Sequence, residues 1–357
     1  MNIEDILLPP REIKTEKWQL GNLISGEIKE NGIVLIFCSD YRGLENGSAE
    51  ILDFRKVRKE LYQLSQLDFE LPLCDIGDLI SGKSHQDTHY ILQEVLSMCL
   101  YKNAIPVIVG GSSDLAFSLF SALNFHQKNI NYTQISNIIS LNNETNEISE
   151  KNFLSKILGS KTFTLKNYHH LGYQKHLNAL DSVKLMKEVE FEVMRLAEMM
   201  NATERAEPYL RRADLVTLNC DAVESLGDGF SVNPQVNGLN KREICAYMKE
   251  IGLSENLKSV GIFNFNANSE DLLNHQLLAQ MIWYLIEGIN IQKSHPKERS
   301  YETFWVLIEE DQYAFKRDTF SDLWYFGEGE EIEKLLPCAK WEFEDAKRGY
   351  LNPRLLK

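Results

Sequence analysis

The chain of 357 residues is 43% hydrophobic and 25% charged, and its net charge is −14. These values are typical of a globular protein with one large α/β domain or two smaller ones. The acidic balance argues against general binding to nucleic acids or anionic membranes. The six cysteines form no CxxC pair, and most lie in apolar runs. We therefore expect free, buried thiols rather than disulfides or a zinc site.

The first residues lack the basic region and apolar core of a signal peptide. No apolar run approaches the length of a transmembrane helix. From these two features we expect a cytoplasmic, reducing location.

Apolar runs of strand length alternate with helical patterns along the chain. We predict strands within 32–40, 71–79, 104–111, 135–143, 160–169, 213–221 and 257–266. We predict helices within 48–64, 89–103, 115–123, 182–200, 241–253 and 273–289. This alternation predicts a three-layer α/β/α fold, in which helices cover both faces of a mostly parallel central sheet. The ligand site of such a fold lies beyond the carboxyl ends of the strands.

The composition changes after residue 291. Residues 292–300 are polar and are typical of a linker, and the remaining residues are rich in aromatic side chains. We predict a domain over 1–291 and a C-terminal extension over 292–357 that packs on it, because so short a segment is marginal as an independent core. The extension contains Trp305, Trp324, Tyr325, Phe326 and Trp341. Most of these should pack the extension onto the domain, and the alternative for some is a protein interface.

Polar residues follow four of the predicted strands. The stretches are GGSSD (110–114), SLNNETNE (140–147), TLNCDAVESLGDG (217–229) and FNFNAN (263–268). Polar clusters that follow buried strands predict a shared pocket.

These stretches, in this order, resemble the motifs of the ureohydrolase family, which comprises arginase, agmatinase and formimidoylglutamase. The family motifs are GGDHS, DAHxD, SxDxDxxDP and an ExNP element, each at the matching strand-to-loop junction. The resemblance covers roughly residues 32–289 and includes DYRGLENG, RKELYQL, CDIGD and NGLNKRE. The style of RGxxNG and RKxLYxL is closest to formimidoylglutamase. The resemblance implies an arginase-like fold and makes a homo-oligomer plausible, because family members are commonly trimers or hexamers.

The resemblance also implies where a dimanganese centre would lie. In the family, two manganese ions and a bridging hydroxide attack a guanidinium or formimino carbon. The ligand positions fall on Ser113, Asn142, Glu144, Asn146, Asn219 and Asp221. The Asp of GGDHS falls on Ser112, the later Asp of SxDxDxxDP on Glu224, and the guanidinium-binding Glu on Asn264. Only Asp221 is unchanged among the six ligand positions, and Glu144 replaces a histidine with another possible ligand.

Neutral amides are weak ligands and cannot offset the charge of two divalent ions. We therefore predict that no metal binds at these six positions and that they carry no catalytic residue. Asp221 and Glu144 remain as residual candidates for one weakly held ion.

Several residues near the strand ends leave alternatives open. Ser112 or Ser113 is predicted to cap the following helix, and a serine nucleophile is the alternative, although GxSxG is absent. His169 and His170 are predicted to be hydrogen-bonded strand-end residues, with a catalytic pair as the alternative. Asp221 and Glu224 are either remnants of the family site or partners of a lysine or arginine.

The sequence therefore favours a catalytically inactive ureohydrolase-like protein that acts as an interaction or scaffold subunit with a protein partner and needs no cofactor. One alternative is a divergent, manganese-dependent hydrolase of C–N bonds in guanidino or formimino compounds. Another is a metal-free sensor of a polar small molecule.

Overall fold

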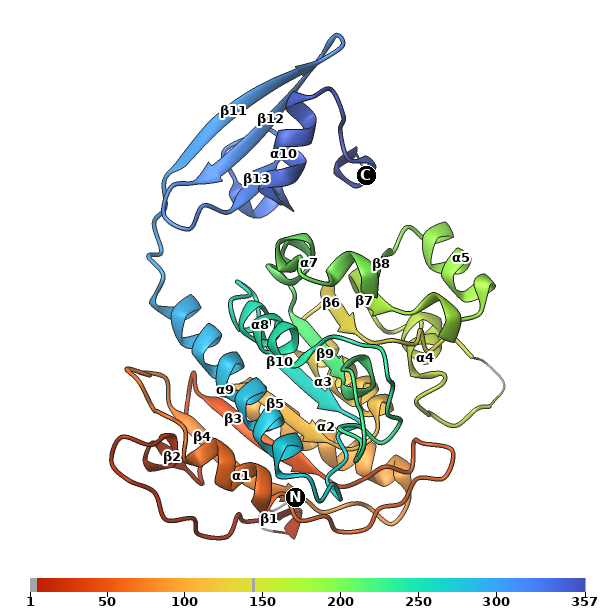
Figure 1. Ribbon diagram of the computed structural model, residues 1–357, viewed down its shortest axis with the longest axis vertical. Helices are drawn as coiled ribbons and strands as arrows, with labels where there is room; N and C mark the ends of the chain where they lie inside the picture. Colours follow the sequence, from red (N-terminus) through yellow and green to blue (C-terminus); the bar gives the residue numbers. More distant parts are fainter. Residues whose placement is uncertain (1–4, 143–144, 357) are drawn as a thin grey trace.

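The computed structural model describes residues 5–142 and 145–356. Within these residues a ten-stranded sheet forms the centre of the molecule (Figure 1). Its strands are β1 (Leu7–Leu8), β2 (Ile24–Ser25), β3 (Ile33–Cys38), β4 (Leu73–Leu79), β5 (Ile105–Gly110), β6 (Ile130–Ile135), β7 (Leu165–Tyr173), β8 (Glu192–Arg195), β9 (Leu215–Asn219) and β10 (Ser259–Phe263). The order is β1-β4-β3-β5-β10-β9-β6-β7-β8, with β2 beside β4. All these pairs are parallel except β1 with β4.

The two faces of the sheet bury different side chains of the same strands, because successive residues of a strand point to opposite faces. Leu35 and Phe37 of β3 pack in one core with α1 (Arg55–Tyr62), α8 (Lys241–Gly252) and α9 (Leu272–Ser294). Val34 and Ile36 pack in the other core with α2 (His85–Tyr101), α3 (Ala116–His126) and α4 (Phe153–Gly159). The predicted three-layer α/β/α fold with a mostly parallel sheet is therefore confirmed.

Three predicted elements differ from the structure. The segment 182–200 is not one helix but α5 (Leu180–Glu188), β8 and α6 (Leu196–Met199). Glu190 has a φ of 61°, a left-handed conformation that interrupts a helix, and β8 then pairs with β7. The strand predicted within 135–143 is wrong, because β6 spans Ile130–Ile135 and the described residues 136–142 form no strand. The helix predicted from residue 48 begins only at Arg55, and Ile51 is 80% exposed.

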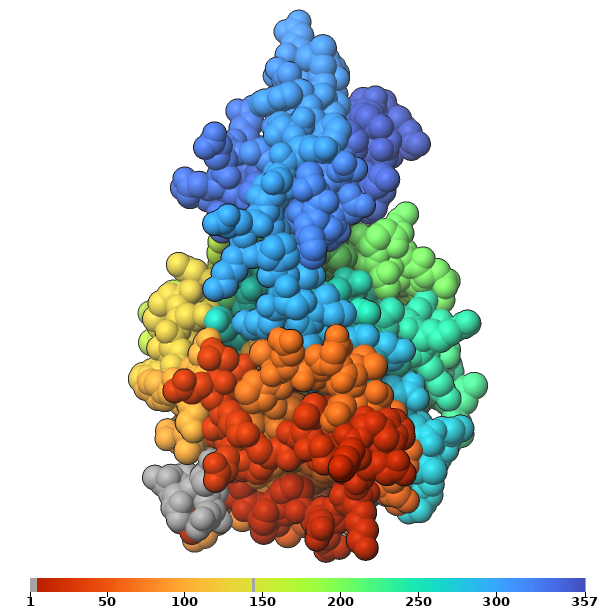
Figure 2. Space-filling view, turned by 90° about the vertical axis from the view of Figure 1, so that its left-hand side faces the viewer, coloured from red at the N-terminus to blue at the C-terminus, as the bar shows by residue number. Residues whose placement is uncertain are grey.

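A second, antiparallel sheet follows α9. It contains β11 (Tyr301–Ile308), β12 (Asp311–Asp318), β13 (Trp324–Phe326) and β14 (Leu336–Cys338), in that order. The helix α10 (Lys340–Lys347) packs on it, and the rings of Phe343 and Trp324 lie 4.4 Å apart. The β11–β12 hairpin stands out at one end of the molecule (Figure 2). The predicted boundary at 291/292 lies inside α9, and the division of the chain into two domains stays a prediction.

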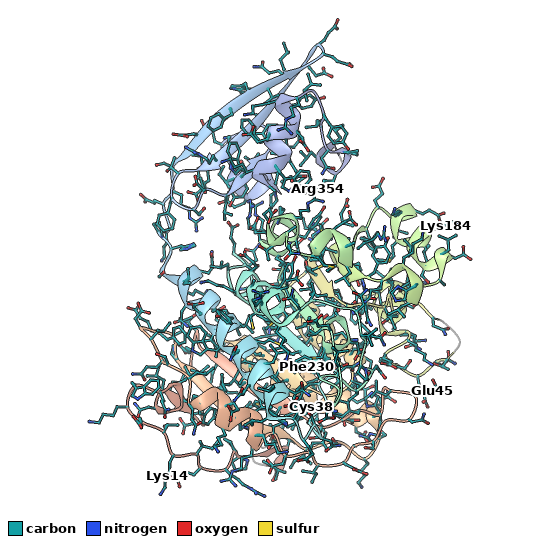
Figure 3. The ribbon with its side chains drawn as sticks, viewed as in Figure 1. Lys14, Cys38, Glu45, Lys184, Phe230 and Arg354 are labelled. Carbon is teal, nitrogen blue, oxygen red and sulfur yellow. The ribbon has the colours of Figure 1, made fainter. Side chains whose placement is uncertain are left out.

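Two arginines after α7 (Thr203–Leu210) attach this second sheet to the main body. Arg211 is buried and donates to the backbone oxygens of Trp324, at 2.5 Å, and Cys338, at 3.1 Å. Arg212 donates to the backbone oxygen of Leu335 at 2.7 Å. Near the C-terminus the guanidinium of Arg354 lies over the ring of Tyr209 in α7, and Figure 3 labels this arginine between the two parts. Polar contacts therefore hold the extension on the domain.

The prediction of free, buried thiols is confirmed. All six cysteines are buried and none is in a disulfide. No helix in the described part of the chain combines the length and the apolarity that crossing a bilayer requires.

Candidate functional site

The carboxyl ends of β3, β5, β10 and β9 are neighbours in the sheet. Backbone and side-chain hydrogen bonds tie the loops after these strands together. The Ser112 N–H donates to the Asp40 oxygen at 3.0 Å, and the Asn264 N–H donates to the Gly111 oxygen at 2.8 Å. The Tyr41 hydroxyl donates to the Phe265 oxygen at 2.7 Å. The loops thus form one connected surface at the edge where a parallel sheet places its ligand site.

A cluster of amides and carboxylates occupies this edge, and we name Ser113, Glu150, Asp221, Asn233 and Asn264 the amide cluster. Asn264 Nδ2 donates to Asp221 Oδ2 at 2.8 Å, and Asn233 Nδ2 donates to the same oxygen at 3.2 Å. Asn264 Oδ1 accepts from the Ser113 N–H at 2.9 Å. Glu150 Oε2 accepts from Asn233 Nδ2 at 3.3 Å and from Asn264 Nδ2 at 3.4 Å. Each carboxylate therefore faces amide hydrogens.

The backbone of Asn264 fixes this arrangement. Its φ is 59°, in the left-handed region that asparagine tolerates better than most residues. The residue is fully buried, and its backbone oxygen accepts from the Val232 N–H at 2.9 Å. The loop after β9 and the end of β5 thus hold the side chain of Asn264 between Ser113 and Asp221.

The two acidic groups of the amide cluster are shielded from solvent to different degrees, since Asp221 is buried and Glu150 is half-buried. Burial raises the pKa of Glu150 to about 7, and the nearby negative charge of Asp221 adds to this effect. Burial also raises the pKa of Asp221, although the amides of Asn264 and Asn233 stabilise its charged form.

The structure places the predicted former-ligand positions in different surroundings. Ser113, Asn219 and Asp221 are buried, and Asn219 Oδ1 accepts from the Asp221 N–H at 3.0 Å. Asn142 and Asn146 are exposed on the loop after β6. Glu144 lies outside the described residues. Ser113 and Asp221 meet through Asn264, whereas Asn146 borders a neighbouring cavity of about 700 Å³.

The prediction that Ser112 or Ser113 caps the next helix is wrong. A short 3₁₀ turn, Ser113–Leu115, precedes α3, so neither serine lies at the start of the α-helix. No side-chain cap is formed at either start. The Ser112 hydroxyl instead accepts from the Gly43 N–H at 3.2 Å and so joins the loop after β5 to the loop after β3.

His169 and His170 form hydrogen bonds, as the simpler prediction has it, but they lie in the middle of β7 and not at a strand end. His169 Nδ1 lies 3.2 Å from the Tyr209 oxygen. His170 Nε2 lies 3.0 Å from the Ser136 oxygen. Burial lowers the pKa of each imidazole to about 4, so both are neutral near pH 7.

Of the two alternatives for Asp221 and Glu224, pairing with a lysine or arginine is not observed among the described residues. Asp221 faces the amides of Asn233 and Asn264 rather than a lysine or arginine. Glu224 is exposed, and its backbone N–H donates to the Leu239 oxygen at 3.0 Å.

A second cluster at the same edge was missed in the sequence, and we name His85, His89 and Asp114 the histidine cluster. The two histidines lie on the first turns of α2, and Asp114 lies in the 3₁₀ turn before α3. Asp114 Oδ2 lies 2.6 Å from His85 Nε2 and 3.0 Å from His89 Nε2. The signal in the sequence is HQDTH (85–89), because histidines four residues apart share one face of a helix.

Two residues of the loop after β3 support the histidine cluster. Asp40 is fully buried, and its Oδ1 lies 3.1 Å from His85 Nδ1. Arg42 Nη2 donates to Asp40 Oδ2 at 2.6 Å. Burial opposes the charge of His85, but the carboxylates of Asp114 and Asp40 outweigh it and raise the pKa of His85 to about 9. Burial opposes the charge of Asp114 as well, and its two histidine neighbours lower its pKa.

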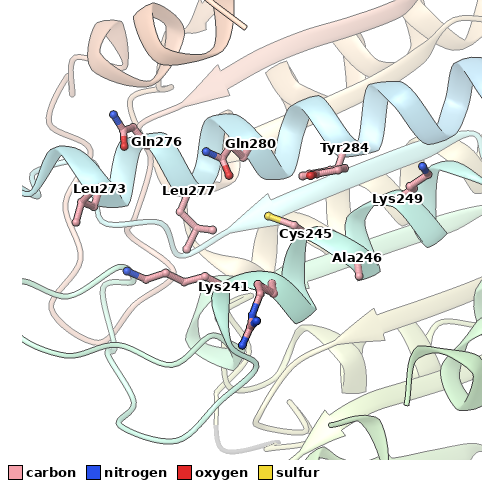
Figure 4. A pocket seen from close by; sticks show the side chains of 10 residues that line it. Lys241, Cys245, Ala246, Lys249, Leu273, Gln276, Leu277, Gln280 and Tyr284 are labelled. Carbon is pink, nitrogen blue, oxygen red and sulfur yellow. The ribbon is translucent and has the colours of Figure 1, made fainter. Parts of the chain in front are cut away.

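A further hollow of about 470 Å³ lies between α8 and α9 (Figure 4). Leu273, Leu277 and Tyr284 of α9 line it together with Cys245 of α8. Lysine and arginine side chains are also part of its lining, whereas carboxylates and histidines are not. This hollow therefore lacks the carboxylates and imidazoles that converge at the strand ends, and we take the strand-end clusters as the candidate site.

The described part of the family ligand set does not fit two manganese ions. Asn264 and Asn233 turn amide N–H groups toward Asp221, and such groups donate hydrogen bonds but cannot coordinate a cation. Ser113 and Asn219 add no charge. Hard divalent ions require several anionic oxygens, and among these described positions only Asp221 supplies them.

Three solved structures are similar to this chain over most of its length. Formimidoylglutamase from Bacillus subtilis subsp. subtilis str. 168 is 14% identical with a TM-score of 0.66, and the match covers 76% of this chain and 92% of that chain. Formiminoglutamase from Trypanosoma cruzi with Mn²⁺ is 17% identical with a TM-score of 0.67, over 78% and 99% of the two chains. Proclavaminate amidino hydrolase from Streptomyces clavuligerus is 13% identical with a TM-score of 0.66, over 78% and 98%.

No curated protein sequence matches this chain. At such low identities the similar structures show the fold alone. A sequence model of the Arginase family, however, matches residues 36–286, which span the central sheet from β3 to β10 and most of α9. The chain therefore belongs to the Arginase family.

Proposed function

We propose that this chain is an Arginase-family protein that has lost the dimanganese chemistry of ureohydrolases and acts by binding a protein partner. The observation that carries the proposal is the amide cluster. The amide of Asn264 fills the space between Ser113 and Asp221, where the resemblance to ureohydrolases puts metal and substrate groups. A neutral amide keeps the shape of a carboxylate site and removes the charge that a metal pair needs.

The C-terminal extension supports the binding part of the proposal. β11 is an edge strand of the second sheet, and its Trp305 and Leu307 are 54% and 70% exposed. These residues are two apart and share one face of the strand. An unpaired strand edge is a template for another chain, and tryptophan is enriched at the centres of protein interfaces. A homo-oligomer is one form that such a partner can take.

Hydrolysis assays test the loss of the chemistry. We expect the natural chain, incubated with Mn²⁺, to release no product from guanidino or formimino compounds. A variant with Ser113→His, Asn142→Asp, Glu144→His, Asn146→Asp and Asn219→Asp should bind Mn²⁺ at least about tenfold more tightly in calorimetry, because it regains anionic and imidazole ligands. Hydrolysis of these compounds by the natural chain would contradict the proposal and favour the alternative of a divergent hydrolase. No gain by the variant would mean that the positions are misassigned or the space is closed.

A further inference from the structure

We propose that His85, His89 and Asp114 form a binding site for one divalent transition-metal ion, of which Zn²⁺ is the best fit. The three residues each offer one ligand atom, and these atoms lie within 4.8 Å of one another. The site is separate from the six positions where the ureohydrolase motifs place their metals. It goes beyond the proposed function, because it requires neither the family chemistry nor its loss.

The first argument is that the donor atoms converge. Both Nε2 atoms point to one carboxylate oxygen, Asp114 Oδ2, at 2.6 Å and 3.0 Å. Zn²⁺ binds imidazole nitrogen at about 2.0–2.1 Å, so the ligand atoms of one tetrahedral ion lie roughly 3.3 Å apart. The two distances to Asp114 Oδ2 lie below this value, and no two of the three ligand atoms are more than 4.8 Å apart, so side-chain rotations are enough to bring them onto one coordination sphere. Two imidazoles and a carboxylate leave a further coordination position open.

The second argument is that the ring of His89 is oriented through its other nitrogen, whereas Nδ1 of His85 lies close to a carboxylate without forming a hydrogen bond among the described residues. His89 Nδ1 lies 2.7 Å from the Ser118 hydroxyl, and Ser118 is buried in α3. His85 Nδ1 lies 3.1 Å from Asp40, which the guanidinium of Arg42 holds in place. A metal-binding histidine commonly has a hydrogen-bond partner, as His89 has in Ser118, which fixes the ring and leaves Nε2 for the metal.

The third argument is a buried carboxylate oxygen without a partner. Asp114 is fully buried, yet its Oδ1 has no hydrogen-bond partner among the described residues. The oxygen lies against Gly43, where a Cβ atom would approach it to 1.7 Å. An unpaired buried acceptor costs about 1–3 kcal/mol, so the position needs a reason. A cation beside the Asp114 carboxylate supplies one.

Access and charge also suit a cation. His85 and His89 line the cavity of about 700 Å³, so the histidine cluster adjoins a space that a small ion can enter. The positive end of the α2 dipole opposes a cation. Three carboxylates offset this positive end, namely those of Asp40, Asp114 and Asp87. Asp87 belongs to the capping box of α2. Imidazole nitrogen favours Zn²⁺ and its neighbours in the first transition row over Mg²⁺ or Ca²⁺.

Calorimetry of the full chain tests the site directly. The protein is treated with a chelator, dialysed and titrated with Zn²⁺. We expect one Zn²⁺ per chain, with the affinity reduced at least about 100-fold in His89→Asn and about tenfold in Ser118→Ala, where only the orienting hydroxyl is lost. Zn²⁺ should raise the melting temperature of the natural chain and not that of His85→Asn/His89→Asn. The matched control is His176→Asn, because His176 is exposed and remote in sequence from the cluster.

Two results would overturn the proposal. One is the absence of Zn²⁺ binding to the natural chain. The other is a double variant, His85→Asn/His89→Asn, that binds Zn²⁺ as tightly as the natural chain does. If the double variant fails to fold, Ser118→Ala provides the test. An affinity of Ser118→Ala for Zn²⁺ equal to that of the natural chain would contradict the proposal that Ser118 orients His89 as a ligand.

Discussion

Single side chains at the strand ends carry the proposal that the family chemistry has been lost. Asn264 donates to Asp221 and accepts from the Ser113 N–H, so one amide satisfies groups from two other strand ends. The same amide N–H lies 3.4 Å from Glu150, a residue that the sequence motifs do not mark. The consequence is a half-buried acid, Glu150, beside a buried acid, Asp221, and the stability of the fold should therefore depend on pH.

We predict that Glu150 makes the fold less stable as pH rises. Burial and Asp221 raise the pKa of Glu150 from 4.5 to about 7 in the folded chain. At a pH between these two pKa values, Glu150 is protonated in the folded state and ionised in the unfolded state. The free energy of unfolding therefore falls as pH increases from about 4.5 through 7. Glu150→Gln cannot ionise, so its stability relative to the natural chain should be greater at about pH 8 than at about pH 5.

Urea unfolding at both pH values measures this difference. Glu147→Gln is the matched control, because Glu147 is an exposed glutamate of the same loop. The same stability difference between Glu150→Gln and the natural chain at both pH values would contradict the raised pKa of Glu150.

At the scale of elements, apolar periodicity in the sequence predicts the buried strands. It does not predict breaks that depend on the backbone conformation of a single residue. The runs that became β3, β5 and β10 are continuous and apolar because both faces of the sheet are covered, and they were placed correctly. The helical pattern of 182–200 was misleading, because a left-handed Glu190 ends α5 and an edge strand follows. Periodicity carries no signal for such a change of direction.

The same limit applies to the candidate site. Strand-end motifs located Ser113 and Asp221 because they follow the strands directly. Glu150 and Asn233 reach the amide cluster from long loops, and no spacing in the sequence predicts where long loops fold. The histidine cluster joins α2 to the turn after β5, so its two parts are far apart in the chain. Only the spacing of His85 and His89 was visible in the sequence.

We predict that Arg211 and Arg212 hold the second sheet on the main body. Their guanidinium groups donate to backbone oxygens of β13, of β14 and of the turn before β14. A hydrogen bond from a charged group contributes about 1.5–3 kcal/mol, so the variant Arg211→Met/Arg212→Met should lose roughly 3 kcal/mol or more of docking free energy. Limited proteolysis should then cut faster in the polar segment 295–300.

Arg348→Met is the control for this prediction, because Arg348 is exposed and pairs only with Asp345 three residues earlier among the ion pairs of the described chain. Two protease-resistant fragments would support the predicted division near residue 291. Cleavage of the double variant no faster than that of Arg348→Met would contradict the role of the two arginines.

For the whole molecule, the sheet and its two helical layers have the fold of the similar formimidoylglutamase and amidino hydrolase structures. Two apolar cores, one on each face of the sheet, hold this fold together. The proposed loss of the dimanganese chemistry concerns only the strand-end loops, where neutral side chains stand at most of the predicted ligand positions. Such a separation would let the order of the motifs indicate the family even where the residues of its chemistry have changed.

The central claim is that the dimanganese chemistry has been lost, and the number of manganese ions per chain tests it most directly. The measurement uses His85→Asn/His89→Asn, so that an ion in the histidine cluster is not counted. The protein is incubated with excess Mn²⁺, desalted and analysed by metal mass spectrometry. The account predicts a value near zero. Two tightly held ions per chain would contradict it, because other residues would then have replaced the lost ligands.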